Sequence, residues 1–203
     1  MMLVAVLGAG GKAGSELTKE LVARGHQVRA IGRTESSLPQ GDNIERRPGD
    51  ASTSDAIAEL VQGADAVISA LHFDVSAPTI LEGMKKAGVN RLIVTGGAAS
   101  LTNAEGVRLF DAPGFPEQIK PIVKPGIDFL EDLRGEQQVN WTFFSPAMNF
   151  VEGPRKGEFR LGKDELVTDA EGNSEISYAD AAIVMVDELE QGNNPRGRFT
   201  AAY

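Results

Sequence analysis

Two spacings of apolar residues alternate along the chain. Short continuous apolar runs, typical of buried strands, lie at residues 3–7, 27–31, 43–47, 66–71, 91–95 and 140–145, the third being the weakest. Between them, apolar residues recur every three or four positions, which predicts helices at residues 15–24, 54–62, 78–87 and 117–134. This alternation is typical of an α/β fold with a doubly wound parallel sheet. We therefore predict right-handed crossovers and the strand order 3-2-1-4-5-6.

Prolines and a change of pattern mark the later part of the chain. Pro121 and Pro125 lie inside the predicted helix at 117–134, and we expect them to bend or split it. Further on, the pattern predicts a hairpin of Glu158–Leu161 with Glu165–Thr168 around Gly162, a helix at Ser177–Gln191 and a closing strand at Arg198–Ala202. We expect this part to cap the substrate side of the sheet, within a single domain spanning residues 1–203.

Glycines cluster where the first strand meets the first helix. Gly8, Gly11 and Gly14 are spaced three apart within LVAVLGAGGKAG, residues 3–14. A turn of this kind presents backbone N–H groups and the positive end of a helix dipole to an anion, and a Cβ would block a pyrophosphate. The pattern therefore predicts nucleotide binding, the alternative being a glycine-rich turn with no ligand. The candidate residues are Gly8, Gly10, Gly11, Lys12, Ala13 and Gly14.

The end of the second strand bears on the choice of cofactor. A site specific for NAD usually has an acidic residue there, hydrogen-bonded to the adenosine ribose. This chain has Gly32 followed by Arg33, which can pair with a 2′-phosphate. Lys12 could add a second positive charge. We therefore favour NADP(H) over NAD(H), and the alternative is that both cations are solvated.

Further candidate residues follow the other strands, because the carboxyl ends of parallel strands meet at one edge of the sheet. These cofactor-binding candidates are Asp50, Ala70, Leu71, His72, Thr95, Gly96, Gly97 and Pro146. Asp50 is expected near the adenine or, alternatively, as a loop or helix-capping residue.

His72 is the only plausible acid–base group near the nicotinamide, and it is a catalytic candidate or merely lines the pocket. The loop at 111–116, DAPGFP, could cover a substrate with Phe115. Ser177 and Asp180 form a predicted capping box. His26, beside Gly25, is expected at the surface.

Composition narrows the class of partner. The net charge of −9 argues against general binding to nucleic acids or membrane surfaces. The chain has no cysteine and two distant histidines, so we expect no disulfide and no metal site. The first apolar run is too short for a signal peptide or a membrane span, and we expect a cytoplasmic protein. The expected partner is a small-molecule acceptor, and no oligomeric state is predicted.

Taken together, the motifs resemble those of the atypical short-chain dehydrogenase/reductases. The resemblance is to the NADH-flavin reductase-like family, related to biliverdin reductase B and the nitrogen-metabolite-repressor-like proteins. Its motifs are GAGGKAG (8–14), Arg33, GD (49–50), VTGGAASL (94–101), FPEQIK (115–120), WTFFSPA (141–147), GEFRLG (157–162) and ISYADAA (176–182). The resemblance implies a Rossmann fold, nicotinamide binding at the glycine turn, and reduction of flavins, quinones or similar acceptors, a flavin then being a substrate.

One departure from ordinary short-chain dehydrogenases affects the chemistry. Their Tyr-x-x-x-Lys motif is missing, since Ala182 stands four residues after Tyr178 and Tyr203 ends the chain. The acid for alcohol and ketone chemistry is therefore absent. We predict an NADPH-preferring reductase of flavin or quinone-type acceptors. The alternatives are a non-catalytic dinucleotide sensor and a sugar-nucleotide or isomerase-type enzyme, and the short C-terminal part argues against the latter.

Overall fold

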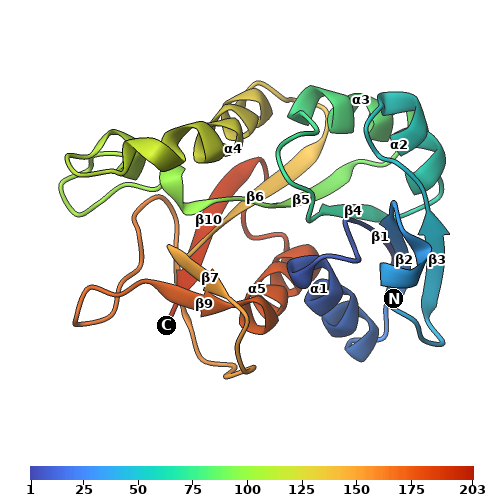
Figure 1. Ribbon diagram of the computed structural model, residues 1–203. Helices are drawn as coiled ribbons and strands as arrows, with labels where there is room; N and C mark the ends of the chain where they lie inside the picture. The colour runs from blue at the N-terminus through green and yellow to red at the C-terminus, as the bar shows by residue number, and fades with distance from the viewer.

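The computed structural model describes residues 1–203 and has an eight-stranded sheet between two layers of helices (Figure 1). The strand order is β3-β2-β1-β4-β5-β6-β10-β8, so the predicted order of the first six strands is confirmed. All neighbours pair in parallel except β8 and β10. The strands are β1 (Leu3–Leu7), β2 (Gln27–Gly32), β3 (Ile44–Pro48), β4 (Ala66–Ser69), β5 (Arg91–Thr95), β6 (Asn140–Pro146), β8 (Arg160–Gly162) and β10 (Gly197–Ala202).

Five α-helices cover the two faces of this sheet. Figure 1 shows α1 (Lys12–Ala23) and α5 (Tyr178–Gln191) on one face, and α2 (Ser54–Val61), α3 (Ala77–Ala87) and α4 (Lys120–Arg134) on the other. Successive side chains of a strand point to opposite faces. In β1, Val4 and Val6 accordingly join the core beneath α1 and α5, and Ala5 and Leu7 join the other core. Both faces are buried, which explains why the strands are continuous apolar runs.

The helix predicted at 117–134 is split near its start, but Pro125 does not interrupt it. The segment is split into a 3₁₀ turn, η4 (Glu117–Ile119), and the helix α4, which begins at Lys120. Pro121 lies in the first turn of α4, where its missing N–H costs no hydrogen bond, and Pro125 lies inside the helix. Three further 3₁₀ turns are η1 (Glu35–Ser37), η2 (Ala98–Ser100) and η3 (Leu109–Asp111).

The hairpin predicted between residues 158–161 and residues 165–168 does not form. β8 pairs antiparallel with β10, and Glu165 instead forms a bridge with Thr102. β8 pairs with the open edge of β10. Gly162 is not in a turn but allows Val167 to pack against the backbone, because a Cβ on Gly162 would lie 2.8 Å from Val167 Cγ2. The predicted final helix and closing strand are confirmed. A separate two-stranded parallel sheet, which the pattern did not predict, joins β7 (Asn149–Val151) and β9 (Glu175–Ser177).

Half of the capping box predicted for α5 is present, because the backbone N–H of Ser177 donates to the Tyr203 hydroxyl rather than to the Asp180 carboxylate. Ser177 Oγ accepts a hydrogen bond of 3.0 Å from the backbone N–H of Asp180. The buried Asp180 carboxylate accepts hydrogen bonds from the backbone N–H groups of Lys156 and Gly157 and, at 2.7 Å, from the Tyr203 hydroxyl. Asp180 therefore holds both the loop before β8 and the last residue against α5.

His26 is not at the surface, contrary to expectation. Its side chain is buried, with Nδ1 3.3 Å from the backbone N of Met2 and Nε2 2.9 Å from a Glu190 carboxylate oxygen. The preceding Arg24 pairs with Asp187 and Glu190. The turn after α1 is thereby tied to α5, which covers the histidine.

Candidate functional site

The carboxyl ends of β1, β2 and β4 enclose a cavity of about 390 Å³, called here the glycine-turn cavity. Its lining combines the glycine turn with residues that follow three strands. The lining residues are Gly8, Gly10, Gly11, Ile31, Gly32, Arg33, Thr34, Ser37, Gly49, Asp50, Ala51, Ser52, Ala70, Leu71, His72, Asp74 and Val75. The strand order therefore brings together eight of the residues predicted from sequence: Gly8, Gly10, Gly11, Arg33, Asp50, Ala70, Leu71 and His72.

Three glycines of the turn, Gly8, Gly11 and Gly14, lack a side chain for different steric reasons. Gly8 has φ +80°, and a Cβ there would lie 2.8 Å from the Ala70 carbonyl oxygen. A Cβ on Gly14 would lie 2.2 Å from the Gly8 carbonyl oxygen, so Gly14 serves the packing of α1 on β1. A Cβ on Gly11 would meet no atom closer than 3.4 Å, so Gly11 leaves open space in the cavity.

Gly11 also begins α1, and no side chain caps the helix there. The first turn of an α-helix has N–H groups without intrahelical partners, and these attract anions together with the helix dipole. The open space at Gly11 and the uncapped helix end form a cradle that fits a pyrophosphate.

Three charged residues line the cavity, Arg33, Asp50 and Asp74, and the first two differ in their contacts. Arg33 is exposed, lines the cavity and makes no ion pair. Its neighbour Arg46, by contrast, lies 3.4 Å from a Glu35 carboxylate oxygen. Asp50 accepts a hydrogen bond of 3.1 Å from Ser52 Oγ. It does not cap α2, because Thr53 does so, which removes the helix-capping alternative for Asp50.

His72 lies in the loop between β4 and α3, exposed and lining the cavity. No side chain or backbone group is hydrogen-bonded to its ring. Phe73, the next residue, packs in the opposite direction, with its ring 5.3 Å from that of Phe129 on α4. The geometry therefore presents His72 to solvent and to the cavity.

Three predicted residues of the turn lie outside the cavity lining. Lys12 Nζ lies 3.7 Å from a Glu152 carboxylate oxygen, and both side chains are exposed. Ala13 and Gly14 are in the first turn of α1, where Gly14 is buried. Lys12 thus stands beside a loop from the C-terminal part of the chain rather than beside Arg33.

A second cavity, of about 470 Å³, lies beyond the ends of β5 and β6, and is called here the apolar cavity. It contains three more predicted residues, Gly96, Gly97 and Pro146. Its lining residues are Gly96, Gly97, Ala98, Ala99, Leu109, Ala112, Pro113, Gly114, Phe115, Pro116, Ile119, Val123, Pro146, Ala147, Met148 and Phe150. Thr95 does not line it, because its hydroxyl is buried 3.5 Å from the sulfur of Met185 on α5.

The two cavities are neighbours along one edge of the sheet. β4 pairs in parallel with β5, and Ala70 follows β4 while Gly96 follows β5. The residues that line the two cavities at this point therefore follow adjacent strands. Sequence reasoning missed Thr34, Ser37 and Ser52 in the first cavity and Met148 and Phe150 in the second. Polar residues directly after β2, and apolar residues directly after β6, were the available signals.

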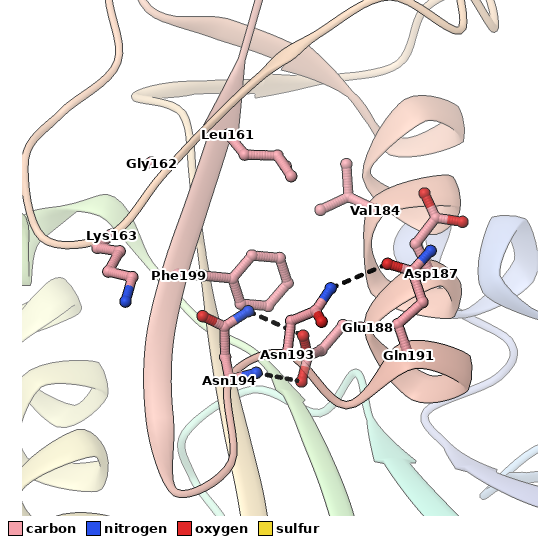
Figure 2. Close-up of a pocket in the computed structure, with 10 residues that line it drawn as sticks. All are labelled: Leu161, Gly162, Lys163, Val184, Asp187, Glu188, Gln191, Asn193, Asn194 and Phe199. Carbon is pink, nitrogen blue, oxygen red and sulfur yellow. Dashed lines mark hydrogen bonds between the residues drawn. The ribbon is translucent and has the colours of Figure 1, made fainter.

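A third cavity lies away from this edge, between α5, β8 and β10 (Figure 2). Figure 2 shows Leu161, Val184 and Phe199 facing its interior. Most of its polar side chains already have partners, although Lys163, which is exposed, has none. Glu188 accepts hydrogen bonds from Arg91, Thr142 and Asn194, and Asp187 pairs with Arg24. This cavity therefore presents mostly packed structural ion pairs rather than free groups for chemistry.

No helix combines the length and apolar character needed to cross a membrane.

Comparisons with known proteins agree with this geometry. Residues 8–192 match the model of a family described as NAD(P)H-binding. The YwnB protein of Bacillus subtilis (strain 168) is 38% identical over 212 residues, which cover 98% of this chain and 97% of that protein.

Two solved structures are similar over nearly their whole length. One, from Bacteroides thetaiotaomicron, bears a name that proposes an epimerase. It is 40% identical with a TM-score of 0.94, covering 100% of this chain and 97% of that one. The other, from Streptococcus pneumoniae TIGR4, bears a name that proposes an NADH-flavin reductase. It is 37% identical with a TM-score of 0.87, covering 100% and 99%. The chain belongs to the NAD(P)H-binding family.

Proposed function

We propose that the protein is an NADPH-dependent reductase of flavin or quinone-type acceptors. The observation that carries this proposal is the position of the two cavities, side by side at the carboxyl edge of the sheet. The glycine-turn cavity suits a dinucleotide, and the apolar cavity suits a ring that stacks beside its nicotinamide. The name of the S. pneumoniae relative points in the same direction.

Three features of the glycine-turn cavity would hold the cofactor. The cradle at Gly11 would bind the pyrophosphate through backbone N–H groups. Arg33 would pair with the 2′-phosphate, and Asp50 would lie near the adenine. Because β2 ends without a carboxylate and Arg33 has no other partner, NADPH is preferred over NADH.

Positioning accounts for most of the proposed catalysis. When bound, the reduced cofactor supplies a hydride. A Cβ on Gly97 would meet no atom within 4 Å, so Gly97 leaves room for the nicotinamide to approach, whereas Gly96 makes room for the ring of Phe143. Pro146 borders the apolar cavity. No acidic or basic side chain lines that cavity, so the acceptor takes its proton from solvent. The alignment of the nicotinamide ring with the acceptor ring then accounts for most of the rate enhancement.

A non-catalytic dinucleotide sensor is the second candidate. The missing Tyr-x-x-x-Lys acid and the lack of any titratable side chain in the apolar cavity favour it. Turnover separates the two functions, because a sensor binds NADPH without oxidising it.

The test is steady-state NADPH oxidation with a panel of flavins and quinones, together with NADPH titration. Gly11→Val should weaken NADPH at least tenfold, on the order of 1.4 kcal/mol. The backbone at Gly11 (φ −81°) accepts a side chain, so the variant should fold. Gly135→Val, at the exposed end of α4, is the matched control and should bind normally.

His72→Ala in the same assay tests the alternative roles of the histidine. If His72 only lines the cavity, the rate should fall within about tenfold, and a required proton donor would cost roughly 10²–10⁴-fold. Tight NADPH binding with no turnover of any acceptor would contradict the reductase and leave the sensor.

A further inference from the structure

The apolar cavity is unusual in its chemistry, since none of its lining side chains is ionisable and none carries an oxygen or nitrogen atom. Its walls are glycine, alanine, proline, aliphatic and aromatic residues, with one methionine. Phe115 lies at the 111–116 loop, and Phe150 is held by an edge contact with Tyr178, 4.4 Å between ring centroids. Only backbone groups can offer hydrogen bonds inside.

The cations around this cavity are already engaged. Three belong to the segment that forms one wall, residues 108–124. Arg108 pairs with Asp111 at 2.6 Å, Lys120 pairs with Glu117, and Lys124 pairs with Asp128 at 2.6 Å. Arg108 and Lys120 also lie over the ring of Phe110. None of the three lines the cavity.

The fourth cation near the cavity is Arg198 on β10. Its guanidinium hydrogen-bonds to the carbonyl and hydroxyl of Ser100, at the end of η2, and pairs with Asp164. It is almost completely buried in this arrangement. No cationic side chain lines the cavity, and these four cations already pair with carboxylates.

An anionic group is strongly disfavoured in such surroundings, because it loses water and gains no partner. An uncharged ring, in contrast, gains from the apolar contact. We propose that the acceptor is an uncharged quinone-type ring, and that the cavity rejects rings with an anionic substituent. The proposal rests on the reductase function proposed above and specifies its acceptor.

The step balances with water as the source of the proton. The quinone accepts a hydride, that is, two electrons and one hydrogen, from the reduced cofactor, which is left oxidised. Water at the open mouth of the cavity gives a proton to the quinone oxygen as the hydride arrives and leaves as hydroxide, so the product is a neutral hydroquinone and no anion remains in the cavity. The phosphate of a flavin mononucleotide, by the same reasoning, finds no cationic partner in the cavity.

The experiment compares two acceptors that share a ring, 1,2-naphthoquinone and 1,2-naphthoquinone-4-sulfonate. Wild type should use the uncharged ring with a kcat/KM at least about tenfold higher. The two acceptors also differ in reduction potential, so the decisive measurement is the change of this ratio in a variant. Met148 lines the cavity and is 62% exposed, which makes it a suitable position for a new charge.

Met148→Lys should shift the kcat/KM ratio toward the sulfonated ring by about tenfold or more, and the neutral control Met148→Gln should not. An unchanged ratio in Met148→Lys, with the sulfonated ring used as well as the uncharged one by wild type, would overturn the proposal.

A binding measurement separates this proposal from the proposed function. If no acceptor is reduced although NADPH binds, the reductase function fails. The selectivity of the cavity is then decided by equilibrium binding of 2-naphthol and naphthalene-2-sulfonate to the NADPH complex. Preferential binding of 2-naphthol, reversed toward the sulfonate in Met148→Lys, supports the uncharged site. Equal binding of both in wild type and variant excludes it.

Discussion

Arg33 is the residue on which the proposed preference for NADPH depends. It follows β2, lines the glycine-turn cavity and has no ion-pair partner. Arg33→Ala should weaken NADPH binding by roughly 1.5–3 kcal/mol, the range for a hydrogen bond to a charged group, and leave NADH nearly unchanged. Titration with both cofactors measures this, with Arg46→Ala as the control because Arg46 already pairs with Glu35. Equal losses for the two cofactors would contradict a 2′-phosphate contact.

At the same scale, the residues predicted well from sequence are those whose role depends on their neighbours in the chain. Gly8 and Gly11 could be found because strand, turn and helix follow one another directly. Lys12 and His26 could not be placed, because their partners Glu152 and Glu190 lie far along the chain. A charge pattern in sequence does not reveal such long-range pairs.

At the scale of elements, Phe73 and Gly126 join the loop after β4 to α4. A Cβ on Gly126 would lie 2.7 Å from Phe73 Cε2. The Phe73 ring therefore packs into space that any side chain at position 126 would fill. Residues on both sides of Phe73 line the glycine-turn cavity, and Val123, one turn before Gly126, lines the apolar cavity. This contact therefore connects a wall of each cavity.

Gly126→Ala should destabilise the protein by about 1–3 kcal/mol through overpacking, although alanine ordinarily favours a helix over glycine. NADPH binding should weaken as the loop moves. Urea unfolding and NADPH titration are the measurements, and the double variant with Phe73→Leu should recover part of both losses. Gly135→Ala, where a Cβ meets only ordinary contacts, is the control. A stable Gly126→Ala with normal NADPH affinity would contradict this account.

Helices and strands could be predicted where their apolar pattern extends over many consecutive residues. The parallel strands and their helices have clear periodicities, and their order follows from general rules of connection. β7, β8 and β9 have three residues each, too few for a pattern. The pairing of β8 with β10 depends on an open strand edge that exists only after the sheet has formed. Short elements paired at long range therefore escaped prediction.

For the whole molecule, Asp180 couples the C-terminal part to the fold in a pH-dependent way. Burial alone would raise the pKa of Asp180, but the hydrogen bonds from Tyr203, Gly157 and Lys156 outweigh it and lower the pKa below its ordinary value of 3.8. A carboxyl whose pKa is lower in the folded state stabilises the fold above its unfolded pKa, and this stabilisation is lost as the pH falls toward the folded value.

The free energy of unfolding should therefore fall as the pH drops below about 4. Asp180→Asn should be less stable than wild type at neutral pH, because its uncharged amide replaces a carboxylate that accepts several hydrogen bonds. The difference between the two proteins should narrow on acidification. Urea unfolding at a series of pH values measures both curves, and a difference that is independent of pH would show that the Asp180 charge does not contribute.

The division of the core between the two faces of the sheet has a consequence for synthesis on the ribosome. The core beneath α2, α3 and α4 uses residues up to Phe143, so it is complete once β6 has emerged. The core beneath α1 needs α5 and β10, which follow β6 in the chain. Chains fold from the N-terminus as they are made. The growing chain therefore exposes the apolar face of α1 until α5 and β10 have been made, and in that interval it is most open to aggregation and to binding by chaperones.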